Sequence, residues 1–287
     1  MTGTAGAGRL VLVATPIGNL GDLSPRAIAT LAEADVVCCE DTRRTRELLA
    51  HAGVRGARLM SLHGHNERAR VDEVLSLVSV GSTVAVVSDA GTPSLSDPGA
   101  RLVAAAVEAG ADVSVVPGPN AVVAALVVSG LATDRFVFEG FLPRRGPDRR
   151  RRLDAVAGDD RTVVLFEAPA RLVATLAELA ERSAPDRRVA VVRELTKLHE
   201  EVWRGTLAGA VSEFSAREVR GEVVVVLAGR VPQASVPSDE ELGRALRARL
   251  DAGGTVRDVA GEVALELGVS RRRAYEAAIA VRRDSPQ

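Results

Sequence analysis

The sequence predicts an α/β protein with two α/β domains and a small C-terminal helical domain. Between residues 10 and 116, short valine-rich runs alternate with helical patterns, which favours a mostly parallel sheet with helices on both faces. Pro-Gly-Pro-Asn at 117–120 indicates a hinge, and a proline-punctuated stretch at 231–238 indicates a linker. The domains expected from these breaks are residues 9–117, 118–230 and 238–284.

The first domain contains five apolar, β-branched runs that suit buried strands. They lie at residues 10–15, 35–39, 58–62, 84–87 and 112–116. Helical patterns follow the first four runs and end near residues 33, 50, 80 and 109. Asp97 and Pro98 predict the start of the last of these helices, with the aspartate as N-cap and the proline at the first helical position.

The second domain continues the alternation, with strands that we expect to be partly antiparallel. The expected strands are residues 135–141, 162–166, 188–192, 201–205 and 222–227. The expected helices are residues 121–128 and 171–182, and an arginine-rich loop at 143–152 runs into a further helix.

The last fifty residues change character and predict three helices. They lie at residues 239–250, 256–267 and 271–282. A tight break at 268–270, with Ser270 as N-cap, separates the last two, so this part resembles a helix-turn-helix. A plain helical hairpin that caps the second domain fits the same pattern equally well.

The composition excludes several classes of function. A net charge of −1 over 287 residues provides no global attraction to nucleic acid or acidic lipid. No run is long and apolar enough to span a membrane, and we expect the adjacent Cys38 and Cys39 to be buried thiols in a reducing cytoplasm. His63 and His65 lack the further ligands that a metal site needs, so no metal is expected. Phosphate-loop, dinucleotide and serine-hydrolase signatures are absent from the sequence.

Polar loops rich in glycine and proline follow the predicted strands, and VSDAGTPSLSDPG at 87–99 is the most prominent. In open α/β sheets, ligands bind at the carboxyl ends of the strands. Gly91 has no side chain, so its backbone groups are expected to reach a ligand directly. Such loops suit a neutral or zwitterionic cofactor better than a triphosphate, which would call for basic residues or a metal. An ordinary strand–helix turn is the alternative interpretation.

Seven segments carry a specific resemblance. In order along the chain they read ATPIGNLGDLSPRAI, CEDTRRTRELL, HGHNE, VSDAGTPSLSDPG, VPGPNAV, DRFVFEGFLPRR and RELTKLHEEVWRGTL. Together they resemble the ribosomal RNA small-subunit methyltransferase I family, which belongs to the tetrapyrrole (corrin/porphyrin) methylase superfamily. The likeness runs from Leu10 to about Leu227, and the C-terminal helices also resemble the extra domain of that family.

The resemblance implies two α/β domains of the tetrapyrrole methylase type and S-adenosylmethionine as the methyl donor. It implies 2′-O-methylation of a cytidine ribose in the decoding centre of 16S ribosomal RNA by a cytoplasmic homodimer. The substrate would be the RNA itself or the assembled 30S subunit. Carried over by motif, the residues expected to bind the donor are Pro16, Asp89, Ala90, Gly91, Ser94, Pro117, Gly118, Ala121, Phe166, Glu167, Val223 and Val224.

A ribose hydroxyl is a weak nucleophile, so a general base would assist the implied transfer. Polar residues at the ends of the second and third strands are the candidates: Glu40, Asp41, His63, His65 and Glu67. Glu40 and Asp41 are the first choice, and His65 is the third catalytic candidate. Alternatively, these acids cap the following helix or pair with Arg43 and Arg44.

One local signal for RNA binding is a dense group of arginines, a residue type that makes phosphate contacts. Its members are Arg144, Arg145, Arg149, Arg150, Arg151 and Arg152. Arg43 is a further candidate, and residues 271–273 offer a second basic patch. The competing interpretation is a solvated loop in a chain that favours arginine, because Lys197 is its only lysine.

Two other functions are consistent with the sequence. The first is a small-molecule methylase that acts on a corrin or porphyrin, whose carboxylates the arginines would hold. The second is a nucleic-acid-binding regulator that uses the C-terminal helices and keeps a vestigial cleft. The HGHNE and EDTRRTRELL motifs favour the RNA branch.

Overall fold

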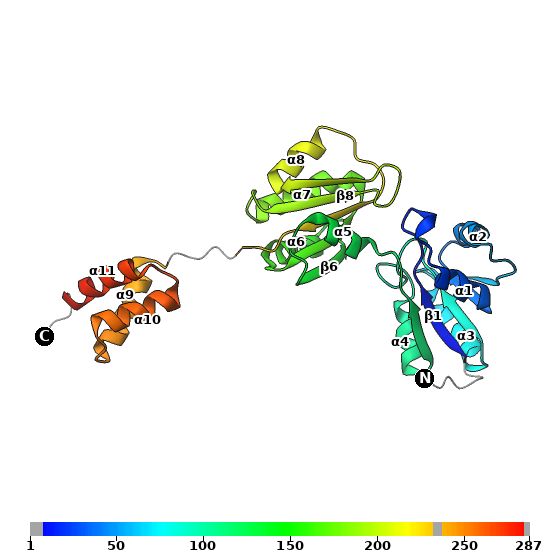
Figure 1. Cartoon of the computed structure of the whole chain (residues 1–287), viewed down its shortest axis with the longest axis horizontal. Coiled ribbons are helices and arrows are strands. Elements are labelled where there is room, and N and C mark those ends of the chain that lie inside the picture. The colour runs from blue at the N-terminus through cyan, green and yellow to red at the C-terminus, as the bar shows by residue number, and fades with distance from the viewer. Residues whose placement is uncertain (1–7, 232–236, 284–287) are drawn as a thin grey trace. The chain divides into compact units, whose positions relative to one another are not determined.

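The computed structural model describes residues 8–231 and 237–283 (Figure 1). The chain divides into two compact units, residues 1–230 and 231–287. Much of the linker expected at 231–238 lies outside the described residues. Among the helices that the structure describes, none combines the length and the apolar character needed to cross a membrane.

Unit 1 begins with a parallel sheet, as predicted, and the structure gives its strand order as β3-β2-β4-β1-β5. Its strands are β1 (Arg9–Val13), β2 (Val36–Cys39), β3 (Leu59–Ser61), β4 (Thr83–Val86) and β5 (Asp112–Val116). The helices are η1 (Leu20–Asp22), α1 (Pro25–Glu33), α2 (Thr42–His51), α3 (Glu67–Ser79) and α4 (Ala100–Glu108).

Helices cover both faces of this first sheet, because its buried strands carry apolar side chains on both sides. Helices α1 and α2 pack on one face and α3 and α4 on the other. Cys38 and Cys39 are adjacent on β2 and therefore point into opposite layers, where both are buried. Burial raises the pKa of the Cys38 thiol to about 12, so that it stays protonated.

The start of α4 differs from the prediction. The helix begins at Ala100 with Gly99 as N-cap, at φ +121°, and Asp97 does not cap it. A carboxylate oxygen of buried Glu67, at the first turn of α3, instead accepts hydrogen bonds from the N–H groups of Gly99 and Arg101, both at 3.0 Å, and of Leu102, at 3.3 Å. The cap is thus supplied by another helix 32 residues away, which leaves the Asp97 carboxylate outside the helix end.

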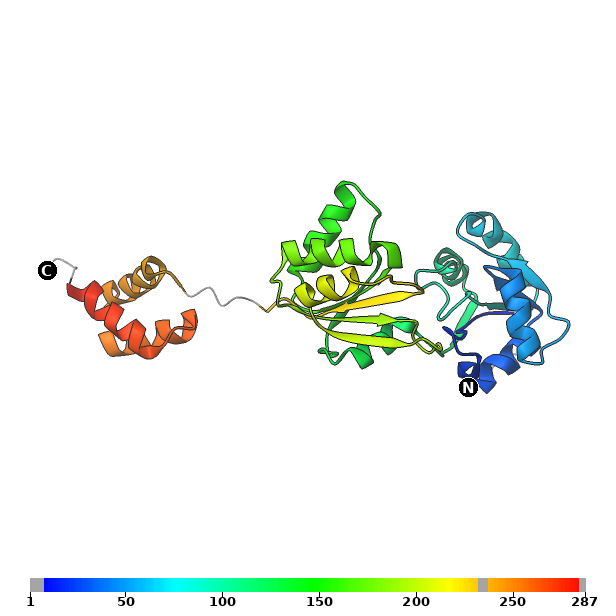
Figure 2. The ribbon, with the colours of Figure 1, turned by 90° about the horizontal axis from the view of Figure 1, so that it is seen from above.

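The second half of unit 1 forms a mixed sheet in the order β6-β7-β10-β8-β9 (Figure 2). Only β6 and β7 run parallel, and the other pairs are antiparallel. The prediction that this sheet is partly antiparallel is therefore confirmed. The strands are β6 (Phe136–Phe141), β7 (Thr162–Glu167), β8 (Arg188–Arg193), β9 (Glu201–Thr206) and β10 (Val223–Leu227). The helices are α5 (Ala121–Ser129), α6 (Pro147–Gly158), η2 (Pro169–Arg171), α7 (Leu172–Arg182) and α8 (Leu207–Ser215).

Helices α6, α7 and α8 cover one face of the second sheet, and α5 packs on the other. Two details correct the prediction. Helix α6 begins at Pro147, so four of the six clustered arginines lie on a helix and not in a loop. Helix α8 was not anticipated, although Thr206 caps it and Leu207, Ala210 and Phe214 form its buried face.

Unit 2 is a bundle of α9 (Asp239–Asp251), α10 (Val256–Leu267) and α11 (Arg271–Arg283) around its own small core. Ser238 and Glu241 form a capping box at the start of α9. Gly268 ends α10 in the left-handed conformation, and the Ser270 hydroxyl accepts a hydrogen bond from the Arg273 N–H, as an N-cap should. All three helices match their predicted positions within one residue.

Candidate functional site

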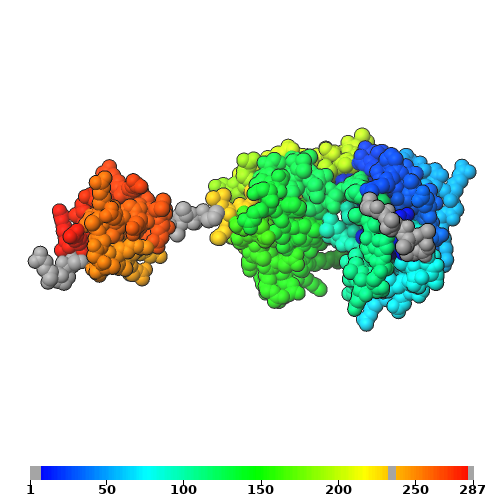
Figure 3. All heavy atoms as spheres, turned by 60° about the horizontal axis from the view of Figure 1, so that its bottom comes forward, coloured from blue at the N-terminus to red at the C-terminus, as the bar shows by residue number. Residues whose placement is uncertain are grey.

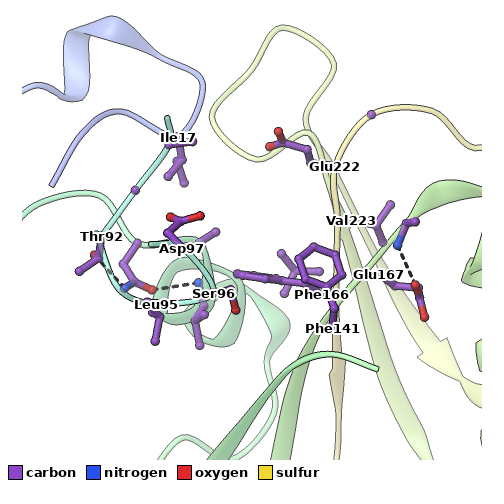
Figure 4. A pocket seen from close by; sticks show the side chains of 18 of the residues that line it. Ile17, Thr92, Leu95, Ser96, Asp97, Phe141, Phe166, Glu167, Glu222 and Val223 are labelled. Carbon is purple, nitrogen blue, oxygen red and sulfur yellow. Dashed lines mark hydrogen bonds between the residues drawn. The ribbon is translucent and has the colours of Figure 1, made fainter. Parts of the chain in front are cut away.

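A cavity of about 400 Å³ opens at the carboxyl ends of β1 and β4 and is closed on its other side by the second sheet (Figure 4). Ile17, residues 90–92 and residues 95–97 line it from the first half of unit 1. The second half contributes residues 120–122, Phe141, residues 166–169 and residues 221–224. In the space-filling view, the surface is hollowed between the elements of the two sheets (Figure 3).

The loops after β1 and β4 are joined below this cavity. The Thr15 N–H donates to the Gly91 carbonyl at 2.9 Å, and the Gly91 N–H donates to the Thr15 carbonyl at 3.1 Å. The Ser88 hydroxyl also donates to the Gly91 carbonyl, at 3.2 Å. The N–H and C=O groups of Gly91 are therefore paired within the chain, although Gly91 itself lines the cavity.

Glycine is needed at position 91 for two other reasons. Its φ of +88° is a conformation that other residues rarely adopt. A Cβ atom there would also lie 3.2 Å from Cγ2 of Ile17, which lines the same cavity. A side chain at this position would consequently strain the loop and crowd the cavity wall.

Aromatic rings form the opposite wall. The Phe166 ring lies 5.0 Å from the Phe138 ring and 5.5 Å from the Phe141 ring, with the rings inclined to one another. Phe141 is 56% exposed although it is large and apolar, and Figure 4 shows both Phe141 and Phe166 at the cavity. Such a surface can stack a planar ring or hold a cation.

Acidic side chains lie at the first-sheet side of the cavity. Burial, reinforced by the nearby negative charges of Glu40 and Asp89, raises the pKa of the Asp97 carboxyl to about 6, although the nearby Ser88 hydroxyl lowers it in part. Burial and Asp89 also raise the pKa of Glu40, which does not line the cavity. Asp89 pairs with Arg44 at 3.3 Å and accepts the Asp41 N–H at 3.1 Å.

The other catalytic candidates lie outside the cavity wall. Asp41 caps α2 through the Arg43 N–H at 2.8 Å and pairs with the Arg43 guanidinium at 3.1 Å, which fits the alternative interpretation of this acid. Those hydrogen bonds lower the pKa of Asp41. His65 is exposed, with its ring 6.0 Å from that of His63, whose Nδ1 is buried without a hydrogen-bond partner in the described structure.

The residues expected to bind a donor divide into two groups. Those that line the cavity are Ala90, Gly91, Ala121, Phe166, Glu167, Val223 and Val224. Those that do not are Pro16, Asp89, Ser94, Pro117 and Gly118.

Members of the second group lie close to the cavity loops. Pro16 and Asp89 line a smaller neighbouring pocket of about 160 Å³. Ser94 has a positive φ of 72° and a buried hydroxyl without a partner in the described structure. Gly118 lies close to Ala14, since a Cβ there would be 3.0 Å from the alanine Cβ.

Glu167 is buried and held within the chain. One of its oxygens accepts the Thr175 hydroxyl at 2.6 Å, and the other accepts the Ala168 N–H at 2.8 Å and pairs with Arg171. The side chain therefore fixes the turn after β7, and residues 166–169 form the cavity wall there.

Lys197, the only lysine in the sequence, lies beside the cavity. The stem of Lys197 packs on Gly18, where a Cβ would lie 2.3 Å from the lysine Cγ. Its Nζ pairs with Glu194 at 2.8 Å and with Glu222, a cavity residue, at 3.1 Å. This lysine joins the loop after β1 to the second sheet beside the cavity.

The clustered arginines separate into distinct roles. Arg149 is buried and donates to Glu178 at 3.0 Å and to the Thr175 hydroxyl at 2.9 Å, so it holds α6 on α7. Arg151 pairs with Asp148, and Arg152 pairs with Glu139. Within residues 8–231, the exposed side chains of Arg144, Arg145 and Arg150 form no ion pair.

Two arginines of the second basic patch, residues 271–273, form ion pairs within unit 2. Arg272 pairs with Glu276 at 2.9 Å, and Arg273 pairs with Asp239 at 2.7 Å and donates to the Pro237 carbonyl. Arg273 therefore ties α11 to the start of α9.

Several cavity residues were missed by the sequence reasoning, chiefly Ile17, Leu95, Asp97, Phe141 and Glu222. Asp97 had been assigned to a helix cap, and Ile17 follows the proline that was singled out. In the described ranges, no cluster of histidine, cysteine and acidic side chains is suited to hold a metal ion.

Comparisons with known proteins agree on one family. The model of the tetrapyrrole (corrin/porphyrin) methylases matches residues 9–211. The ribosomal RNA small subunit methyltransferase I of Synechocystis sp. is 45% identical over 278 residues, 96% of this chain and 99% of that protein. The protein of the same name from Mycobacterium tuberculosis is 47% identical over 281 residues, 97% of each chain.

A solved structure shares the fold at lower identity. Uroporphyrin-III C-methyl transferase from Thermus thermophilus, complexed with S-adenyl homocysteine, superposes with a TM-score of 0.54 at 24% identity. The match covers 77% of this chain and 97% of that one. The likeness confirms the predicted fold class.

Proposed function

Because this chain belongs to the tetrapyrrole (corrin/porphyrin) methylase family, and within it to the ribosomal RNA small subunit methyltransferase I group, we propose that it methylates small-subunit ribosomal RNA. The proposed reaction transfers a methyl group from S-adenosylmethionine to the 2′-oxygen of a cytidine ribose in the decoding centre of 16S RNA. The observation that carries the proposal is identity of 45–47% over nearly the full length of relatives that bear that name. Ribosomal subunits as substrate imply a cytoplasmic location.

The cavity residues fit S-adenosylmethionine. A volume of about 400 Å³ lies within the range of small-molecule sites, roughly 300–1,000 Å³. Phe141 and Phe166 offer ring faces to a base or a cation, and Asp97 adds a carboxylate for a sulfonium. When bound, the donor supplies an electrophilic methyl group on a positively charged sulfur.

We propose that the expected donor residues in the cavity wall touch the donor, and that those outside it position the loops. Ala90, Ala121 and Val224 contribute small apolar surfaces, and the buried carboxylate of Glu167 fixes the turn beneath the donor. Both walls come from loops that the chain holds in place, so the donor would be oriented with little freedom. Orientation of this kind lowers reaction barriers by up to about 7–11 kcal/mol in favourable systems.

The exposed arginines support the RNA part of the proposal. Arg144, Arg145 and Arg150 project from the start of α6 and the turn before it, and no ion pair within residues 8–231 occupies them. We expect Gln at all three positions to weaken binding to 30S subunits and to reduce the slope of log K against log salt by up to about 3, one for each lost phosphate contact. The matched control is Gln at Arg151 and Arg152, which already pair with carboxylates. An unchanged slope in the triple variant would contradict this assignment.

We also propose a homodimer, as the family resemblance implies. Helix α5 is apolar on all sides, yet Val123 is 50% and Val127 67% exposed. The edge strand β5 likewise leaves Val115 53% exposed. A second copy covering these valines would remove them from water, and light scattering on the full chain measures the mass directly; a monomer at micromolar concentration would contradict it.

The experiment that tests the function uses 30S subunits from cells that lack this methylation. Incubation with the protein and S-adenosylmethionine should yield 2′-O-methylcytidine in digests of the 16S RNA, located by mass mapping. Methylation of a tetrapyrrole instead would support a small-molecule methylase. Binding to duplex DNA without binding of S-adenosylmethionine would support the regulator.

A further inference from the structure

Most carboxylates in and near the cavity are held by hydrogen bonds or ion pairs within the protein. Asp41 caps α2, and Glu67 caps α4. Asp89 pairs with Arg44 and accepts a backbone N–H. Glu167 and Glu222, on the second-sheet side, are held by hydrogen bonds and by an ion pair with Lys197, respectively. Each of these acids has its charge compensated within the protein.

Glu40 and Asp97 are different. Within residues 8–231, neither carboxylate forms an ion pair. The nearby Ser88 hydroxyl, which donates to the Gly91 carbonyl at 3.2 Å, lowers the pKa of Asp97 only in part. Only Asp97 of the two lines the cavity, where Figure 4 labels it together with Ile17. An uncompensated, half-buried carboxylate in a ligand cavity is costly unless it has a function.

The loop that presents Asp97 is strained. Ser94 and Ser96, on either side of Leu95, have φ values of 72° and 67°, which are unfavourable for residues other than glycine. The buried Ser94 hydroxyl has no hydrogen-bond partner among the described residues. Such strain persists only where surrounding contacts impose it and tends to gather at functional sites. Here Glu67 holds the end of the loop through the Gly99 N–H.

The charges that face Asp97 suit a base. Glu40 at the end of β2 and Asp89 after β4 both disfavour its ionisation, while Arg44 faces Asp89 and His63 faces Glu40. With burial as the largest contribution, the pKa of Asp97 rises to about 6. A base is most effective when its pKa lies near the working pH, because it is then both ionised and strongly proton-accepting.

We propose that Asp97 is the catalytic base of the methyl transfer, an inference that rests on the proposed function. Its carboxylate takes the proton of the ribose 2′-hydroxyl while the hydroxyl oxygen forms its bond to the methyl carbon. The carbon–sulfur bond breaks at the same time and leaves its electron pair on sulfur, which becomes a neutral thioether. Asp97 then returns the proton to water.

The test compares Asp97→Asn with wild type in single-turnover methylation of 30S subunits. Asn keeps the shape of the side chain but cannot accept the proton. We expect the rate to fall by at least about 100-fold, the lower end of general-base contributions. Binding of S-adenosylhomocysteine, measured by calorimetry, should stay within about threefold of wild type. Asp97→Glu should recover part of the rate.

The pH profile separates this role from a structural one. The wild-type rate should fall below pH of about 6, where Asp97 becomes protonated, and the residual Asp97→Asn rate should lack that limb. Glu40→Gln removes a negative charge beside Asp97, so the limb should move to lower pH with turnover retained. Equal rates in wild type and Asp97→Asn would overturn the assignment. Loss of the rate in Glu40→Gln with retention in Asp97→Asn would assign the base to Glu40.

The pH dependence of protein stability tests the raised pKa of the Asp97 carboxyl without measuring methylation. A raised pKa in the folded protein favours folding below the unfolded value near 3.8, and that contribution is lost as the pH rises through 6. Relative to Asp97→Asn, wild type should therefore lose stability to urea between pH 4 and pH 7. A constant difference would contradict the raised pKa.

The outcomes also separate this role from the proposed function. A wild-type protein that methylates no 30S subunit would overturn the proposed function and this role with it. A wild type that methylates at the same rate as Asp97→Asn would overturn this role alone.

Discussion

The cap that Glu67 provides for α4 allows a quantitative prediction. Three backbone N–H groups, of Gly99, Arg101 and Leu102, donate to one oxygen of a side chain that is only 7% exposed. A hydrogen bond to a charged group contributes about 1.5–3 kcal/mol, and a charge at a partly buried helix end up to about 2 kcal/mol. Because the three donors share one oxygen, these contributions overlap, and we expect Glu67→Ala to lower the free energy of unfolding by about 3 kcal/mol. Glu67→Gln keeps an acceptor oxygen and should cost about 1 kcal/mol.

Two assays measure this loss in different places. Urea unfolding of each variant gives the global cost. Hydrogen exchange of a peptide that contains residues 99–102 gives the local one, where about 3 kcal/mol corresponds to an increase of the order of 100-fold in the opening equilibrium. Glu73→Ala, on the exposed side of the same helix, is the control. Unchanged exchange at residues 99–102 in Glu67→Ala would refute the reasoning, since the cap would then contribute nothing to α4.

Two further substitutions test other parts of unit 1. Gly91→Ala should lower the free energy of unfolding by about 1–2 kcal/mol, because a φ of +88° is unfavourable for alanine. The same substitution should weaken S-adenosylhomocysteine binding in calorimetry. Gly64→Ala is the control and should do neither, because there is open space around Gly64. Arg187→Met should lower the free energy of unfolding in urea by at least about 3 kcal/mol, because the buried guanidinium donates to the carbonyls of Ala157 at 2.7 Å and Ala228 at 2.6 Å. Arg188 is exposed, so Arg188→Met should lower it by less than about 0.5 kcal/mol. Similar costs for the two arginines would contradict that role.

Local signals predicted the elements well where the chain itself provides the boundary. Asn120, the last residue of the predicted hinge, caps α5, which begins at Ala121 as predicted. The strand β5 occupies the predicted residues 112–116. Each of these signals acts over two to three residues, so it is readable from sequence alone.

The errors arise where a distant partner replaces the local one. Asp97-Pro98 has the pattern of a helix start, but Glu67 satisfies the N–H groups of α4 and frees the aspartate. Gly91 was singled out for its backbone groups, and both of them pair with Thr15, 76 residues away, a pairing that the sequence does not reveal. Arg149 was grouped with surface arginines, although it is buried and donates to Glu178 and Thr175. No periodicity in the sequence encodes such long-range pairings.

Lys197 gives the chain one amine besides its N-terminus, and that amine stands beside the cavity. Burial alone would depress its pKa, but Glu194 and Glu222 outweigh that effect and raise the pKa, which leaves little free amine at neutral pH. Reagents that acylate amines should accordingly modify it slowly. Any event that pulls Glu222 away from Lys197 would speed that acylation, so its rate, measured against that of the N-terminal amine, would report whether the cavity is occupied.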